Sequence, residues 1–172
     1  MPLQQPTKDF LGYLRKNPAT RRAIAAPPNA TLLYAGRFIR PIWRELEQLK
    51  RSNPAFADKQ ILPDVLARIA TPGQPYPTLL AWTKALDRQT PWQENGFIVW
   101  RALSGIFASN AIGSVSFSIG SGVDQSKVFV VTELGVLMRN PNVDPLTKDI
   151  LGYYQDCVRT RQTGINFGFV SA

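Results

Sequence analysis

Four polar residues in the second half of the chain are of types that can carry out chemistry. Arg101 is a permanent cation, Ser114 and Ser116 carry hydroxyls two residues apart, and Glu133 is a carboxylate. The chain has no histidine. Because histidine is the commonest general base and metal ligand, its absence excludes Ser-His-Asp triads, Cys-His pairs and HExxH zinc sites. Any reaction here would depend on cations, hydroxyls and carboxylates.

The order Arg…Ser-x-Ser…Glu resembles the one that ADP-ribosyltransferases use. The resemblance implies that Arg101 would hold a phosphate, that Ser114 and Ser116 would shape a nicotinamide pocket, and that Glu133 would stabilise an oxocarbenium-like state. Two features depart from the family pattern. Arg101 lies only thirteen residues before Ser114, and Val131 stands where the family has a second Glu or Gln. The alternative interpretation of the serines is a solvated polar face of a sheet.

Positive charge is concentrated in the first third of the chain. Residues 1–59 contain eleven Lys or Arg against four Asp or Glu, a net charge of +7. Residues 60–172 contain nine against eight, a net charge of +1. A basic surface raises the local concentration of polyanions and speeds their association. A single surface charge is usually only solvated, so the prediction depends on the whole group.

The leading hypothesis is a non-enzymatic or accessory binding protein whose basic N-terminal face engages a polyanion, above all nucleic acid. Aromatic residues such as Phe10 and Tyr13 interleave with these cations and could stack on bases, although their helical spacing is also typical of a core. The chain contains no zinc-finger, KH or RNP pattern. The residues predicted to form this face are Arg15, Lys16, Arg21, Arg22, Arg37, Arg40 and Arg44.

A second hypothesis is a protein-interaction module, such as an inhibitor, adaptor or assembly subunit. Its contact surface would be the segments 71–77 and 90–92, which are rich in proline and contain aromatic residues. Proline fixes the backbone of such segments and reduces the entropy lost on binding. The ADP-ribosyltransferase-like enzyme stays a third alternative.

The composition indicates a single domain over residues 1–172. Hydrophobic residues make up 44% of the chain and charged residues 19%, as in an ordinary globular fold. No apolar run approaches the roughly 18 residues of a membrane-spanning helix, and residues 1–6 lack the pattern of a secretory signal. Cys157 is the only cysteine and cannot form an internal disulfide. We therefore expect a cytoplasmic protein with no metal, cofactor or membrane span.

The spacing of apolar residues, together with the positions of proline, glycine and capping residues, predicts helices over most of the chain. Two segments are ambiguous: residues 31–35 fit a strand or a helix fragment, and residues 97–100 could be a strand instead of the start of a helix. The clearest helix start is Asp144-Pro145, with Asp as the cap and Pro at the first position. The other predicted helices begin at Lys8, capped by Thr7, and at Pro41, and span 63–70, 78–87 and 97–107.

Strands are predicted mainly in the last third. Serine alternates with apolar residues over 114–119, residues 127–132 are rich in β-formers, and residues 165–170 alternate again. The first two segments predict an antiparallel hairpin around the glycines of 120–122. The predicted fold class is therefore α+β, with a helix-rich N-terminal two-thirds and a small antiparallel sheet formed mainly by the C-terminal third.

Overall fold

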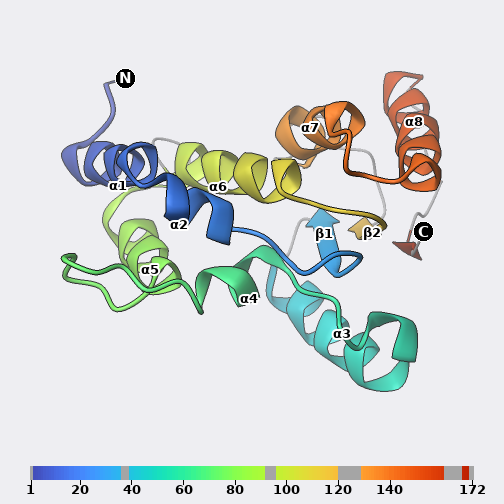
Figure 1. The fold of residues 1–172 in the computed structure, drawn as a ribbon, viewed down its shortest axis with the longest axis horizontal. Helices are drawn as coiled ribbons and strands as arrows, with labels where there is room; N and C mark the ends of the chain where they lie inside the picture. The colour runs from blue at the N-terminus through green and yellow to red at the C-terminus, as the bar shows by residue number, and fades with distance from the viewer. Residues whose placement is uncertain (1, 36–38, 92–95, 120–128, 161–167, 171–172) are drawn as a thin grey trace.

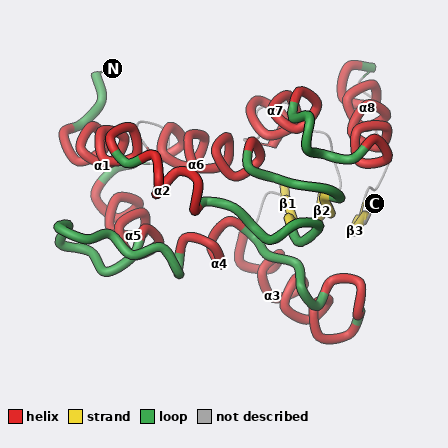
Figure 2. The backbone as a smooth tube through the Cα atoms, viewed as in Figure 1, coloured by secondary structure: helices red, strands yellow, loops and turns green. Residues whose placement is uncertain are grey.

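The computed structural model describes residues 2–35, 39–91, 96–119, 129–160 and 168–170. Helices predominate, and the strands form one small sheet (Figures 1 and 2). The strands are β1 (Thr31–Ala35), β2 (Val115–Ile119) and β3 (Gly168–Val170). The α-helices are α1 (Gln5–Lys16), α2 (Pro18–Ala23), α3 (Ile39–Ser52), α4 (Leu62–Leu66), α5 (Leu79–Gln89), α6 (Phe97–Ser109), α7 (Leu134–Arg139) and α8 (Pro145–Arg159).

The helices lie in two rows in the view of Figure 1. One row contains α1, α6 and α7, the other contains α5, α4 and α3, and β1 and β2 lie between the rows. Helix α8 stands at the end of the molecule where β3 also lies (Figure 2). Helix α1 lies at the opposite end of the molecule from α8. Within the described ranges, no helix combines the length and apolar character needed to cross a membrane.

The first helix begins earlier than the sequence predicted. Helix α1 starts at Gln5, and Pro6 occupies its first turn, where the missing N–H of proline is not needed. Thr7 therefore lies inside the helix, fully buried, and caps nothing. With Phe10 and Leu14 it forms the buried face of α1.

Side chains cap the starts of α5 and α8. The Thr78 hydroxyl accepts a hydrogen bond from the Ala81 amide at the start of α5, at 3.2 Å. Asp144 Oδ1 accepts one from the Thr147 amide at 2.9 Å, and Pro145 opens α8, which confirms the predicted start. A cap of this kind contributes about 1 kcal/mol because it satisfies an otherwise unpaired N–H.

The ambiguous segments adopt one structure each. Residues 31–35 form β1, and residues 97–100 belong to the continuous helix α6. Helix α4 ends at Leu66 and does not reach Ala70 as predicted. Ala70 instead forms an isolated antiparallel bridge with Thr78, which removes it from the helix.

The predicted antiparallel sheet is wrong in its central pairing. Strand β2 pairs with β1 in parallel, and only the short β3 pairs with β2 antiparallel. The register places Thr31 opposite Val115 and Ala35 opposite Ile119. The sheet therefore begins in the first third of the chain and not in the last. A parallel pair requires a long crossover, here supplied by α3 to α6, and local alternation in sequence carries no information about such a distant partner.

The predicted hairpin is also wrong. Residues Phe129–Glu133 form a π-helix that leads directly into α7, although the segment is rich in β-formers. Residues 127–128 and the glycine segment 120–122 lie outside the described residues. The π-helix contacts both α6 and β1. β-Propensity is context-dependent, and tertiary packing overrides it in this segment.

The alternating serines of β2 are not a solvated face. Ser116 is fully buried and Ser118 is nearly so, and the alternating apolar residues Val115 and Phe117 are buried as well. Both faces of β2 are therefore covered, as is usual for a strand in a parallel pair. The hydroxyls of this strand lie inside the molecule.

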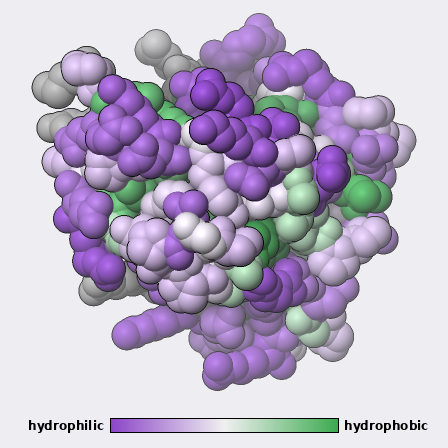
Figure 3. All heavy atoms as spheres, turned by 60° about the vertical axis from the view of Figure 1, so that its left-hand side comes forward, coloured by the Kyte–Doolittle hydropathy of each residue, from purple (hydrophilic) through white to green (hydrophobic). Residues whose placement is uncertain are grey.

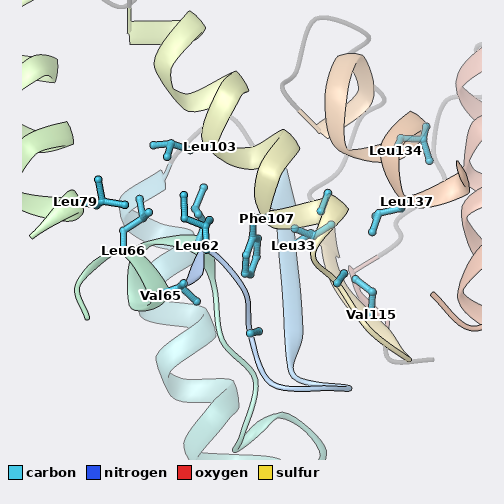
Figure 4. Close-up of a cluster of buried hydrophobic side chains, with 14 of the residues drawn as sticks. Leu33, Leu62, Val65, Leu66, Leu79, Leu103, Phe107, Val115, Leu134 and Leu137 are labelled. Carbon is cyan, nitrogen blue, oxygen red and sulfur yellow. The ribbon is translucent and has the colours of Figure 1, made fainter. Parts of the chain in front are cut away.

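The main core joins both rows of helices to the sheet. Figure 4 shows Leu33 of β1, Phe107 of α6 and Leu137 of α7 directed into the same interior region. Each of the three is at most 2% exposed. Burial of a side chain of this size stabilises the fold by roughly 1.5 to 3 kcal/mol.

Loops from three parts of the chain meet at Gly113. The Gly113 amide donates to the Asn142 carbonyl at 2.8 Å, and the Gly113 carbonyl accepts from the Asp144 amide at 3.1 Å. Asn29, which has a left-handed backbone with φ of 62°, accepts a hydrogen bond from the Ser114 amide through its side chain, at 2.8 Å. This junction fixes where β2 begins relative to β1.

Candidate functional site

Four of the predicted basic residues lie on two consecutive helices. Arg15 and Lys16 are in the last turn of α1, and Arg21 and Arg22 are in the last turn of α2. All four are exposed, and none has an ion pair with another described residue. We call these four residues the α1–α2 basic surface. Figure 3 brings this end of the molecule forward and shows hydrophilic side chains over much of it.

Helix α2 buries none of its own side chains. Its end is fixed by the fully buried Ile24 at the C-cap and by the Asn110 side-chain amide, which donates to the Arg21 carbonyl at 2.8 Å and to the Ile24 carbonyl at 3.0 Å. The Arg21 carbonyl also accepts a hydrogen bond from the Ile24 amide at 3.3 Å. Arg21 and Arg22 are therefore held at a defined place while their side chains remain in solvent.

The same positions also have a structural explanation. The C-terminal end of a helix carries partial negative charge, so cations in the last turn stabilise it by about 0.3 to 1 kcal/mol each. This effect accounts for basic residues at the end of α1 or α2. It does not explain why none of the side chains of α2 is buried.

The structure does not bring all seven predicted residues together. Arg44 is exposed on α3, which Figure 1 shows well away from α1 and α2. Arg37 lies outside the described residues, and the side chain of Arg40 is not described. The candidate surface is therefore reduced to the end of α1 and to α2.

The aromatic residues between these cations serve the core. The rings of Phe10 and Tyr13 pack on Trp82 of α5, with centroids 5.0 Å and 5.2 Å from its ring. Phe10 is fully buried. These contacts join α1 to α5 and leave no stacking platform for nucleic-acid bases at this part of α1.

The loop predicted for protein interaction is partly engaged by the domain itself. Tyr76 stacks on Trp82 with a centroid distance of 5.6 Å, and buried Thr71 donates its hydroxyl proton to the Tyr76 carbonyl. Thr90 is also buried, and residue 92 lies outside the described residues. The exposed prolines of the loop remain accessible.

The residues of the transferase alternative are not collected in one pocket. Arg101 is exposed on α6, where its Nε donates to Thr132 Oγ1 at 3.0 Å, and it lines an open groove. Neither Ser114, Ser116 nor Glu133 lines that groove. Ser116 is fully buried, so it has no access to a dinucleotide in this conformation. The geometry does not favour this reaction.

Glu133 has the most unusual environment of the described carboxylates. It is 6% exposed at the junction of the π-helix and α7. Burial raises the pKa of the Glu133 carboxyl from 4.5 to about 7, and a hydrogen bond with Ser104 opposes this only in part. The carboxyl can thus exchange a proton near neutral pH. The sequence singled out Glu133 because it completes the order Arg…Ser-x-Ser…Glu, but nothing in the sequence indicated that its side chain is buried.

Two aspartates show smaller perturbations that have structural causes. Partial burial raises the pKa of Asp87, although the Trp100 indole N–H donates a hydrogen bond to it. Burial alone would raise the pKa of Asp144, but hydrogen bonds from the Thr147 amide and hydroxyl outweigh it, and the pKa is lowered. In the part of the chain that the structure describes, no group of three or more Cys, Asp or Glu side chains is arranged so that it could hold a metal ion.

Comparison with family models, with curated proteins and with solved structures finds no match to this chain. The candidate surfaces are therefore judged on their geometry and charge alone.

Proposed function

We propose that the α1–α2 basic surface binds the phosphate backbone of nucleic acid without reading its sequence. The observation that carries this proposal is helix α2, whose six residues bury no side chain although Asn110 anchors the helix end. The fully buried Ile24 at the C-cap of α2 and the Asn110 hydrogen bonds anchor the helix at one end, while none of its own six side chains is buried. This arrangement leaves Arg21 and Arg22 available to an anionic partner.

Charge supports this assignment. Between Gln5 and Ala23 the only acid is Asp9, which accepts a hydrogen bond from Gln5 at 2.7 Å. Four exposed cations without acidic partners can each neutralise one phosphate and release its condensed counterion. Arginine suits this role because its planar guanidinium contacts two phosphate oxygens at once. With no aromatic side chain free for stacking at this site, the contacts are to phosphate and carry no base specificity.

Fluorescence anisotropy with a labelled 20-nucleotide DNA of mixed sequence tests the proposal. For four phosphate contacts, log K should fall with log salt with a slope of about −3.6 on duplex and about −2.8 on single-stranded DNA. Replacing Arg21 and Arg22 by alanine should reduce the slope on duplex by about 1.8, because two contacts are lost.

The matched control is the double variant Arg44→Ala, Arg51→Ala, which removes the same charge from exposed positions on α3. It should leave the slope nearly unchanged. If both double variants weaken binding equally, only diffuse net charge is at work and the proposed surface is wrong. Absence of binding at 50 mM salt by the wild-type chain would also reject it.

A further inference from the structure

A groove runs between α6 and the π-helix–α7 segment, remote in sequence from the α1–α2 basic surface. Its volume is about 470 Å³. Within the described residues, its lining is mostly apolar and includes no acid. We call it the α6 groove, lined by Ile98, Arg101, Ala102, Gly105, Ile106, Ser109, Thr132 and Val136.

Small residues on α6 form the floor of the α6 groove. Ala102, Gly105 and Ser109 recur at helical spacing, so they share one face of α6. At Gly105 the π-helix comes close, since a β-carbon there would lie 3.2 Å from Thr132 Cγ2. A face of small residues allows another helix to approach closely. The lining runs along α6 from Ile98 to Ser109, about 16 Å, which matches three turns of a docked helix.

Apolar surface remains exposed at and beside the α6 groove. Ile98 is 37% exposed, and Val131, next to Thr132, is 41% exposed. In the described part of the chain nothing covers these side chains enough to bury them. Apolar residues grouped around a groove mark an interaction surface more often than isolated ones do.

One cation lines the α6 groove and a second lies close to it in sequence on α7. On α6, the Arg101 guanidinium is held by Thr132, with its terminal nitrogens still able to donate. On α7, exposed Arg139 follows the lining residue Val136 by three positions, so the two share one side of that helix. Neither arginine forms an ion pair with a described residue.

We propose that the α6 groove docks an acidic amphipathic helix of a partner protein. Leucine-like residues on one face of that helix would cover Ile98, Ile106 and Val136. Carboxylates flanking that face would pair with Arg101 and Arg139. The open apolar floor fits the apolar face of a helix. The two guanidiniums, which form no ion pair with a described residue, favour a partner helix that carries carboxylates.

The probe is a fluorescein-labelled 18-residue peptide with leucine at helical spacing on one face and glutamate on the flanks. A second peptide has lysine in place of every glutamate. The wild-type chain should bind the glutamate peptide at least tenfold more tightly than the lysine peptide. Arg101→Glu with Arg139→Glu should reverse this preference, and Ala102→Glu, which places a carboxylate on the apolar floor, should weaken the glutamate peptide at least tenfold.

Two control variants separate this site from the nucleic-acid surface. Both Arg21→Ala with Arg22→Ala and Arg44→Glu with Arg51→Glu should leave the peptide preference unchanged. Circular dichroism must show the wild-type helix content for each variant, and Arg101→Gln replaces any charge reversal that fails to fold. The proposal is overturned if the first control abolishes the preference, or if charge reversal at Arg101 and Arg139 does not alter it. It is also overturned if sedimentation shows a dimer that Ala102→Glu dissociates, because the occupant is then a second copy of the chain.

Discussion

The side-chain oxygen of Asn29 occupies the place where a β-carbon on Gly113 would stand. That oxygen accepts the Ser114 amide hydrogen bond at the entry to β2, and Asn29 itself adopts a left-handed backbone. The two residues are far apart in sequence, but the Asn29 side chain can take this position only because residue 113 has no β-carbon. This contact and a hydrogen bond from the Asn29 amide to the Ile112 carbonyl, at 2.9 Å, join the loop before β1 to the loop before β2.

Gly113→Ala should destabilise the fold by about 2 to 4 kcal/mol, because the new β-carbon meets Asn29 and the φ of +75° is strained for alanine. Urea denaturation measures the change. Gly12→Ala is the matched control: it lies within α1 with open space around it, so alanine should stabilise by about 0.5 to 1 kcal/mol. An equal response at the two positions would show that the Asn29 contact contributes little.

Glu133→Gln should stabilise the protein at pH 8 by up to about 3 kcal/mol and change little at pH 4. The folded carboxyl has a raised pKa of about 7 against 4.5. Between these values the folded state holds a proton that the unfolded state has lost, so stability falls as pH rises through this window. Denaturation curves at pH 4, 6 and 8 check the prediction. A variant less stable than wild type at pH 8 would contradict it and indicate a favourable partner for the ionised carboxylate.

Asn110→Ala should loosen α2 without unfolding the domain, because it removes both hydrogen bonds to the Arg21 and Ile24 carbonyls. At roughly 1 kcal/mol for each bond, the locally open state becomes about five to thirty times more populated. Limited trypsin digestion reads this out as faster cleavage after Arg21 and Arg22. The neighbouring Ser109→Ala, which removes only a bond to the Ile106 carbonyl, should leave this rate unchanged.

Thr147→Val should cost about 2 to 3 kcal/mol, since the buried Val115 amide then loses its acceptor and Asp144 loses a donor. Thr147→Ser keeps the hydroxyl and should recover most of the loss. Because Asp144 has a lowered pKa, its contribution is present above its ordinary value of 3.8 and is lost as pH falls through the folded value. The difference between wild type and the valine variant should therefore shrink on acidification, which thermal melts at pH 2.5 and pH 6 would reveal.

Local features of the fold could be predicted from sequence. The start of α8 at Asp144-Pro145 and the strand over 115–119 follow from short-range capping and alternation. The parallel partner of β2 could not be predicted, because alternation specifies a face and never a neighbour. The π-helix Phe129–Glu133 was likewise hidden by residues that favour strands.

For the candidate sites, too, the sequence predicted local properties and did not predict those that depend on the tertiary fold. The excess of cations in residues 1–59 is a property of composition, but its division between α1–α2 and α3 depends on the tertiary fold. The alternation of Ser116 with Phe117 suggested an exposed hydroxyl row, and parallel pairing buries it. The α6 groove had no sequence signal beyond small residues at helical spacing.

The parallel pairing of β1 with β2 also has a consequence for biosynthesis. Ala35 ends β1 and Val115 begins β2, so 115 − 35 = 80 positions separate the two. At roughly 5 to 20 residues per second of translation, β1 leaves the ribosome about 4 to 16 seconds before its partner exists. During that interval the apolar Leu32–Leu33 segment lacks β2, although Gln60 can already pair beside it. Until β2 is synthesised, this edge of β1 is therefore open to pairing with other chains.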